Sequence, residues 1–253
     1  MIEYAKLMTQ AAMLRKRLGE DSSSSIDIFA LAQRVENLTI VYYPLGDNLS
    51  GMCIKGQEDN NLIAVNSAMS LGRQRFSLGH EFYHLFYDDS MISICSIKIN
   101  TGKDIEKSAD MFASYFLMPD AALIEYAGSL ASKRAGGMLS LEDVIRIEQY
   151  FGVSHQAAVY RLMHTPYLTE ATGNDYLTTP VRRLAESLGY STDLYRPLPK
   201  DKQYMTYGHY INQVEQLLSK ELISYGKYEE LLMDAFRSDI VFGNGDEEGD
   251  VID

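Results

Sequence analysis

The sequence is poor in cysteine: only Cys53 and Cys95 occur in 253 residues, far apart and in no metal-ligand spacing. A disulfide framework is therefore not expected, and both thiols are interpreted as reduced, packed side chains. Long apolar runs are also lacking, since none approaches the ~20 residues that cross a bilayer. The segment Met1–Lys6 lacks the basic-then-apolar pattern of a signal peptide. We therefore expect a cytoplasmic protein that is neither secreted nor inserted into a membrane.

The chain has fewer basic than acidic residues. The net charge is −12 at pH 7, with 15 basic against 19 acidic residues up to residue 168, and 8 against 16 after it. Such a surface repels phosphate backbones, so direct binding of nucleic acid is not expected. The 46% apolar composition is sufficient for a sizeable core in a chain of this length.

Apolar spacing predicts a mixture of helices and a small β-sheet, which is the α+β fold class. Helices are expected at residues 2–19, 26–35, 70–86, 105–117, 140–150, 154–163, 178–188, 205–219 and 225–236. A meander of three short strands is expected at Leu38–Tyr43, Gly51–Lys55 and Leu62–Asn66. The segment Gly243–Asp253 is acidic and contains glycine, which predicts disorder.

The strongest signal is the motif His80-Glu81-Phe82-Tyr83-His84 in the expected helix 70–86. Residues four apart on an α-helix lie ~6 Å from one another on one face, so His80 and His84 can bind one ion. Glu81 is turned about 100° from His80 and flanks the ion instead of binding it. With five histidines in the chain, chance predicts on the order of 0.01 occurrences of this motif. The motif therefore indicates a zinc site.

The histidine motif has a second possible explanation, and it does not identify the metal. Two histidines could be hydrogen-bonded in the core without a metal, but the glutamate between them would then be a carboxylate near a buried face without purpose. A set of two histidines and a carboxylate also suits manganese or iron. We retain zinc as the expected cofactor.

A catalytic zinc has three protein ligands and a fourth position for water. Asp88 lies two turns beyond His80, roughly 12 Å along the same axis, so it cannot converge with both histidines. The helix 105–117 offers Glu106 and Asp110 at i and i+4, with alanines small enough for close packing. Glu106 is predicted to be the third ligand, and Asp110 to accept a hydrogen bond from a ligating histidine. Without the upstream motif, a solvated Glu106 paired with a lysine would be preferred.

Peptide hydrolysis is the chemistry that this set supports. The ion would lower the pKa of a water molecule toward ~7 and polarise the scissile carbonyl, while Glu81 takes the proton and later gives it to the leaving amine. The oxyanion needs a further donor. Tyr83, Tyr115, His155 and Tyr160 are candidates, but in a chain with 18 tyrosines each is more often a packing residue. This role stays unassigned.

The helices expected at 140–150 and 154–163 are joined by Phe151-Gly152-Val153 and resemble a helix-turn-helix. Residues 140–165 contain two arginines against three acidic residues, which is not the basic footprint of a groove-binding helix. A packing or docking role is therefore expected for this pair.

Two blocks of sequence resemble the ImmA/IrrE metallopeptidase family. They are Arg75–Leu85, which contains the histidine motif, and Glu106–Ala113, followed by Leu117-Met118-Pro119. Looser similarity extends from the N-terminal helices to Leu162. Members of the family often have Gly where this chain has Tyr83, and Asn where it has Asp110; neither difference removes a ligand or the base.

The resemblance implies an architecture and a set of site residues. The architecture is a zincin-like metallopeptidase domain at residues 1–168, including the pair at 140–165, followed by a helical extension with an acidic tail at 169–253. The site comprises the ligands His80, His84 and Glu106, with Glu81 catalytic and Asp110 in support.

The resemblance also implies a function: an endopeptidase that cleaves a DNA-binding transcriptional repressor of a phage, a mobile element or a stress response. The expected partner is therefore a protein, which the acidic region after residue 169 could attract, although this region could equally serve solubility. The alternative is a zinc-containing regulatory protein that binds a repressor or a toxin-antitoxin partner without proteolysis. The intact Glu81 argues against this alternative.

Overall fold

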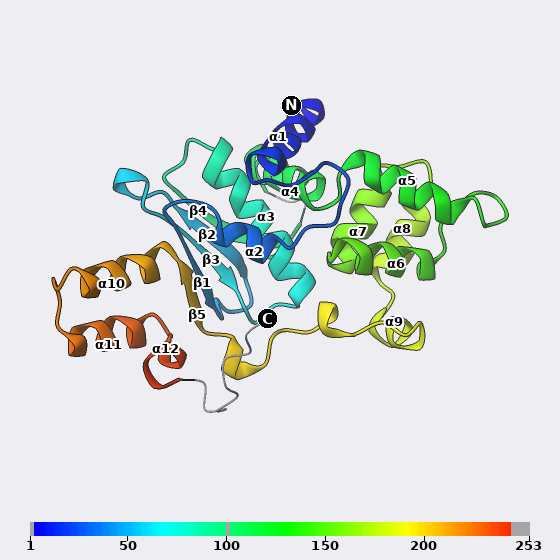
Figure 1. Ribbon diagram of the computed structural model, residues 1–253. Helices are drawn as coiled ribbons and strands as arrows, with labels where there is room; N and C mark the ends of the chain where they lie inside the picture. The colour runs from blue at the N-terminus through cyan, green and yellow to red at the C-terminus, as the bar shows by residue number, and fades with distance from the viewer. Residues whose placement is uncertain (1–2, 100–101, 244–253) are drawn as a thin grey trace.

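The computed structural model describes residues 3–99 and 102–243, and it confirms the α+β class (Figure 1). Within these ranges the strands are β1 (Leu38–Tyr43), β2 (Leu49–Ile54), β3 (Asn61–Asn66), β4 (Ile92–Ser96) and β5 (Met205–Gly208). The helices are α1 (Tyr4–Arg17), α2 (Ile28–Gln33), α3 (Leu71–Tyr87), α4 (Asp104–Leu117), α5 (Asp120–Ala131), α6 (Leu141–Phe151), α7 (His155–Leu162), α8 (Glu170–Leu177), α9 (Arg182–Ser187), α10 (His209–Ser219), α11 (Tyr225–Asp234) and α12 (Ser238–Phe242).

The strands form one mixed sheet in the order β4-β2-β3-β1-β5, so the predicted meander is wrong. β1 pairs in parallel with β3, and β2 pairs antiparallel with the other edge of β3. The chain between β1 and β2 therefore crosses the end of β3. The buried amide of Asn66 holds this crossing: its nitrogen donates to the carbonyls of Gly46 and Leu49, and its oxygen accepts from the amide of Leu45. One side chain thus satisfies backbone groups that a hairpin ladder would otherwise pair.

Small residues bring α4 close to α3, which packs on β2 and β3 (Figure 1). A Cβ added to Gly79 would lie 3.4 Å from the Cβ of Ala113. Ala109 and Ala113 are fully buried at this contact. Helices that meet over small side chains approach closely, so the polar residues on the adjoining face of α4 lie against the histidines of α3.

The helix-turn-helix-like pair is α6 and α7, and it packs into the protein core. Ser140 begins α6 with a capping box to Asp143, and Gly152 ends it in the left-handed region at φ 65°. Ser154 then caps α7 through the amide of Ala157. The buried residues of α7 include Ala157, Ala158, Val159, Arg161 and Leu162. This burial accounts for the lack of a basic face.

Two strands, and the helices α5, α8 and α12, were not predicted from the sequence. β4 lies in a segment for which no element was predicted, and β5 occupies the first four residues of the expected helix 205–219. β5 pairs antiparallel with β1, so the C-terminal region completes the sheet and is not helical throughout. Gly208 has a φ of 84°, which glycine adopts without strain, and α10 begins after it.

The last three helices gather around a small cluster of their own, formed by Val214, Tyr228 and Leu232. Disorder was predicted for Gly243–Asp253, of which residues 244–253 lie outside the described ranges. Among the described residues, no helix combines the length and the apolar character that a membrane span requires.

Candidate metal centre

α3 and α4 bring three predicted residues together. The buried Nε2 atoms of His80 and His84 lie 3.2 Å apart. The carboxylate oxygens of Glu106 lie 3.4 Å from His80 Nε2 and 3.5 Å from His84 Nε2. Donor atoms placed tetrahedrally at ~2.0–2.1 Å from zinc are separated by roughly 3.3 Å. The three side chains therefore have the spacing that a zinc ion requires.

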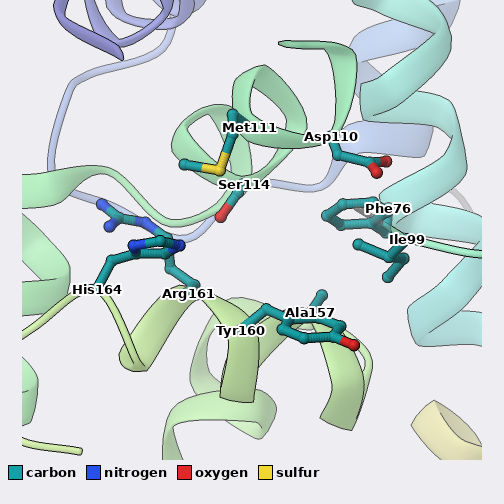
Figure 2. A pocket seen from close by; sticks show the side chains of 9 residues that line it. All are labelled: Phe76, Ile99, Asp110, Met111, Ser114, Ala157, Tyr160, Arg161 and His164. Carbon is teal, nitrogen blue, oxygen red and sulfur yellow. The ribbon is translucent and has the colours of Figure 1, made fainter. Parts of the chain in front are cut away.

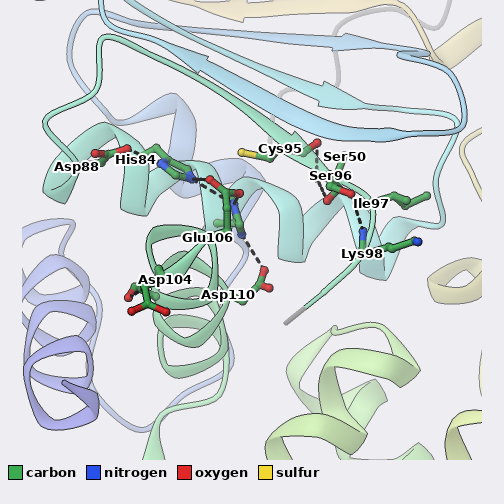
Figure 3. Close-up of polar contacts among 12 residues, drawn as sticks. Ser50, His84, Asp88, Cys95, Ser96, Ile97, Lys98, Asp104, Glu106 and Asp110 are labelled. Carbon is green, nitrogen blue, oxygen red and sulfur yellow. Dashed lines mark hydrogen bonds and ion pairs between the residues drawn. The ribbon is translucent and has the colours of Figure 1, made fainter. Parts of the chain in front are cut away.

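A carboxylate contacts the Nδ1 atom of each histidine, and Figure 3 shows this for His84 and Asp88. Asp110 Oδ1 lies 2.8 Å from His80 Nδ1, and Asp88 Oδ2 lies 2.8 Å from His84 Nδ1. Such an acceptor fixes the proton on Nδ1, which leaves the Nε2 lone pair for an ion. Asp110 thus lies where its predicted role places it. Asp88 has a role that the sequence reasoning missed, although its i+4 spacing from His84 could have indicated it.

Cys95 is a fourth potential metal-binding group, and the sequence reasoning missed it. It lies on β4 with a fully buried thiol, and one donor atom each of His80, His84, Cys95 and Glu106 lie within 4.8 Å of one another. Figure 3 shows its side chain directed from the sheet toward Glu106. Strand pairing, not helix periodicity, places Cys95 here, so no spacing relates it to the histidine motif. The sequence of β4 gave no signal for Cys95, because its isoleucines Ile92 and Ile94 are exposed whereas Ser93 and Cys95 are buried.

Glu81 is fully buried beside β2. Its two carboxylate oxygens accept no hydrogen bond of normal geometry from the described residues, although the Ser93 hydroxyl and the Cys95 thiol lie beside them. Gly51 of β2 makes room for it, since a Cβ there would lie 2.7 Å from Glu81 Oε1. Burial raises the pKa of Glu81 to about 7. An unpartnered buried carboxylate costs stability and is characteristic of a functional group, and this pKa suits proton exchange near neutrality.

The charges of the cluster favour a cation. Three carboxylates, Asp88, Glu106 and Asp110, surround two imidazole rings. The neighbouring His80 lowers the pKa of Glu106. Burial opposes ionisation of Asp88, but its hydrogen bond with His84 lowers the pKa of this carboxyl overall. With the rings neutral, the set carries excess negative charge that a divalent ion would neutralise.

A pocket adjoins the cluster between α3, α4 and α7 (Figure 2). Asp110, whose carboxylate contacts His80 Nδ1, forms part of its wall. Phe76, Ile99 and Met111 give it apolar surface, and Tyr160 lies opposite them on α7. Arg161 and His164 also line the pocket, so its surface is of mixed polarity.

Of the four candidates for oxyanion donor, Tyr160 lines this pocket. Tyr83 packs in the aromatic core, and the ring of Tyr115 lies under the guanidinium of Arg161. Both ring nitrogens of His155 are engaged in hydrogen bonds within the α6–α8 region. Tyr160 therefore lies near the cluster, but no contact assigns it the role of oxyanion donor.

A family model, peptidase M78, described as the IrrE N-terminal-like domain, matches residues 25–163. The matched region spans α2 to α7 with the strands β1 to β4, and it includes every residue of the cluster. No curated protein matches the chain.

Proposed function

The chain belongs to the IrrE N-terminal-like domain family of metallopeptidases, and on this premise we propose that it is a zinc-dependent endopeptidase that cleaves a DNA-binding transcriptional repressor. One observation carries the enzymatic part: Glu81 is buried without a hydrogen-bond partner among the described residues, beside a convergent set of metal donors. A metal site that only stabilised the fold would have no use for such a carboxylate.

His80, His84 and Glu106 would hold the ion, as their spacing and charge indicate. When bound, it supplies Lewis acidity toward the scissile carbonyl and the attacking water. Asp110 and Asp88 keep both rings in the tautomer that presents Nε2. The ligand geometry is thus fixed by contacts that form before any substrate arrives.

Glu81 moves the protons in this proposal. Its carboxylate accepts one from the water that attacks the peptide and then delivers it to the amine of the leaving chain. Burial raises its pKa to about 7, so both protonation states are accessible near neutral pH. The space above Gly51 lets the carboxylate reach its position without a neighbouring side chain in the way.

The edge strand β4 offers a binding mode for the substrate backbone. β4 pairs with β2 on one side, and no described strand pairs with its outer edge. An extended peptide can add to such an edge as a further strand. Because Cys95 on β4 faces the metal donors, a peptide on this edge would pass beside them.

Two observations support a repressor as substrate. The chain resembles ImmA/IrrE peptidases, and its net charge is −12. A DNA-binding repressor presents a basic surface, so attraction between the two would speed association, an effect that salt screens. A cytoplasmic location belongs to the same proposal, because the repressor acts there on DNA.

The test is repressor cleavage by wild-type protein and Glu81→Gln. Gln keeps the volume of Glu but cannot take the proton, so cleavage is expected to fall by about 10²- to 10⁴-fold, with zinc content unchanged. The protein is incubated with the repressor encoded beside its gene, and products are identified by mass spectrometry.

The competing function is a zinc-containing protein that regulates a repressor or a toxin-antitoxin partner by binding alone. It predicts that wild type and Glu81→Gln act identically and that the partner stays intact. Wild-type turnover in the variant would remove Glu81 from the role of base. A His80→Ala/His84→Ala variant with undiminished zinc would refute the ligand set.

A further inference from the structure

Cys95 is the member of the metal cluster for which the proposed mechanism has no use. We propose that its thiolate is a fourth protein ligand, which closes the metal site in a latent state, and that hydrolysis requires the sulfur to leave. This inference rests on the proposed function and concerns the regulation of the same site.

Geometry places the sulfur with the other donors. The thiol is fully buried, and donor atoms of His80, His84, Cys95 and Glu106 lie within 4.8 Å of one another. In a tetrahedral zinc site with one sulfur at ~2.3 Å, the sulfur lies roughly 3.6 Å from each nitrogen or oxygen donor. A movement of at most about 1.2 Å would therefore bring the sulfur into a set of two nitrogens, one oxygen and one sulfur.

The sulfur also lies on the side of the metal site that faces Glu81. Cys95 pairs across the ladder with Gly51, and Gly51 is the residue whose missing side chain accommodates the carboxylate of Glu81. The thiol consequently borders both Glu81 and the ligands. A catalytic zinc site keeps one position open, whereas a site with four protein ligands is closed. Bound sulfur would thus exclude the reacting water from the position that Glu81 serves.

Coordination involves no change of oxidation state. The Cys95 S–H bond breaks, the proton passes to solvent, and the sulfur lone pair forms the bond to the metal. Release is the reverse exchange. β4 is an edge strand with one described neighbour, so a peptide that pairs with its free edge acts directly on the strand that holds the sulfur. Substrate binding is therefore the event that would open the site.

The experiment loads the full chain with cobalt(II) or zinc in four versions: wild type, Cys95→Ser, Cys95→Ala and Cys53→Ser. Cys53 is the matched control because it is a buried thiol on the neighbouring strand β2 that is not a member of the donor cluster. Wild type and Cys53→Ser should show sulfur-to-cobalt charge-transfer absorption in the near ultraviolet, which both Cys95 variants lose. Zinc affinity in a chelator competition should fall about tenfold or more in the Cys95 variants alone.

X-ray absorption of zinc-loaded wild type provides a readout that needs no variant, with one sulfur expected at ~2.3 Å. Cleavage of the repressor should be faster with Cys95→Ser than with wild type. Nitrogen and oxygen scatterers only, or identical cobalt spectra in all four proteins, would overturn the inference and leave the proposed peptidase intact. Failure of every version to bind metal would overturn the proposed function as well.

Discussion

Gly51 carries no side chain, and the placement of the proposed base depends on this. In Gly51→Ala, the new methyl group would meet Glu81 Oε1 at 2.7 Å and the carbonyl oxygen of Ala64 at 2.9 Å. Displacing a reacting group by about 1 Å can cost roughly 10²-fold in rate, so cleavage should fall by about that factor while zinc content is retained. Overpacking should also lower stability by about 1–3 kcal/mol.

Kinetics and urea unfolding of Gly51→Ala measure both effects, with Gly226→Ala as the control. Gly226 has an ordinary helical backbone and nothing within 4 Å of an added Cβ. Equal rates for the two variants would show that Glu81 tolerates a neighbour at this position.

Asp110 is expected to act through His80, and the two possible replacements separate its charge from its hydrogen bond. Asp110→Ala removes the acceptor for His80 Nδ1, so zinc affinity should fall by about 10- to 100-fold. Asp110→Asn keeps an oxygen acceptor and should stay closer to wild type. Chelator competition measures the affinities, with the exposed Glu125→Ala on α5 as a carboxylate control. Asn and Ala variants of equal affinity would contradict the orienting role.

Individual site residues were predictable from sequence when one helix supplied the spacing. His80, Glu81 and His84 follow from the turn of α3, and Glu106 with Asp110 from the turn of α4. Cys95 and Gly51 were not predictable, because they reach the cluster through the pairing of β2 with β4. Strand register depends on distant segments, so local periodicity does not determine it.

At the scale of elements, one buried pair joins α6, α7 and α8. His155 Nδ1 lies 2.5 Å from Glu148 Oε1, and His155 Nε2 lies 2.8 Å from the carbonyl of Tyr176. A carbonyl can only accept, as can an ionised carboxylate, so the charged imidazolium is favoured. Burial opposes this charge, but the hydrogen bond to Glu148 raises the pKa of His155 overall. Tyr195 donates to the second oxygen of Glu148.

This pair predicts a pH dependence of stability. The pKa of His155 is higher in the folded than in the unfolded protein. The contribution of the charged ring to the folding free energy is therefore fully present below the ordinary histidine pKa of ~6.5. It is lost as the pH rises through the pKa of His155 in the folded protein. Thermal unfolding of wild type between pH 6 and 9 should show this loss, at about 1.4 kcal/mol per unit of pKa shift. The Glu148→Gln/His155→Gln variant lacks both charges and should give a flatter profile. Parallel profiles would contradict the assignment.

Length helped the prediction of elements but did not decide it, since the six residues of α2 were predicted and the twelve residues of α5 were not. The helices α3 and α4 span more than three turns, and their periodicity is clear in the sequence. β4 and β5 have five and four residues, too few for a reliable period, and β5 was absorbed into the following helix. The crossing from β1 to β2 depends on the buried side chain of Asn66. No turn motif in the sequence predicts this crossing.

At the scale of the molecule, the C-terminal region contributes to the core sheet. Tyr42 of β1 packs edge-on against Tyr207 of β5, with ring centroids 6.0 Å apart. A chain ended after Gln203 should lose several kcal/mol of stability, since each lost hydrogen bond contributes about 1 kcal/mol and Tyr42 becomes exposed. A chain ended after Phe242 keeps β5 and should unfold like wild type. Urea unfolding measures both, and equal midpoints would contradict a stabilising role for β5.

The pairing of β1 with β5 can form only late in the synthesis of the chain. Ile40 pairs with Tyr207, so β1 emerges from the ribosome long before its partner exists. At about 5–20 residues per second, the interval is on the order of ten seconds to half a minute. Throughout it, β1 presents an open edge that can pair wrongly with other chains. The five-stranded sheet is therefore complete only when most of the chain has been made, whereas the residues of the metal cluster and of the matched family domain all precede β5.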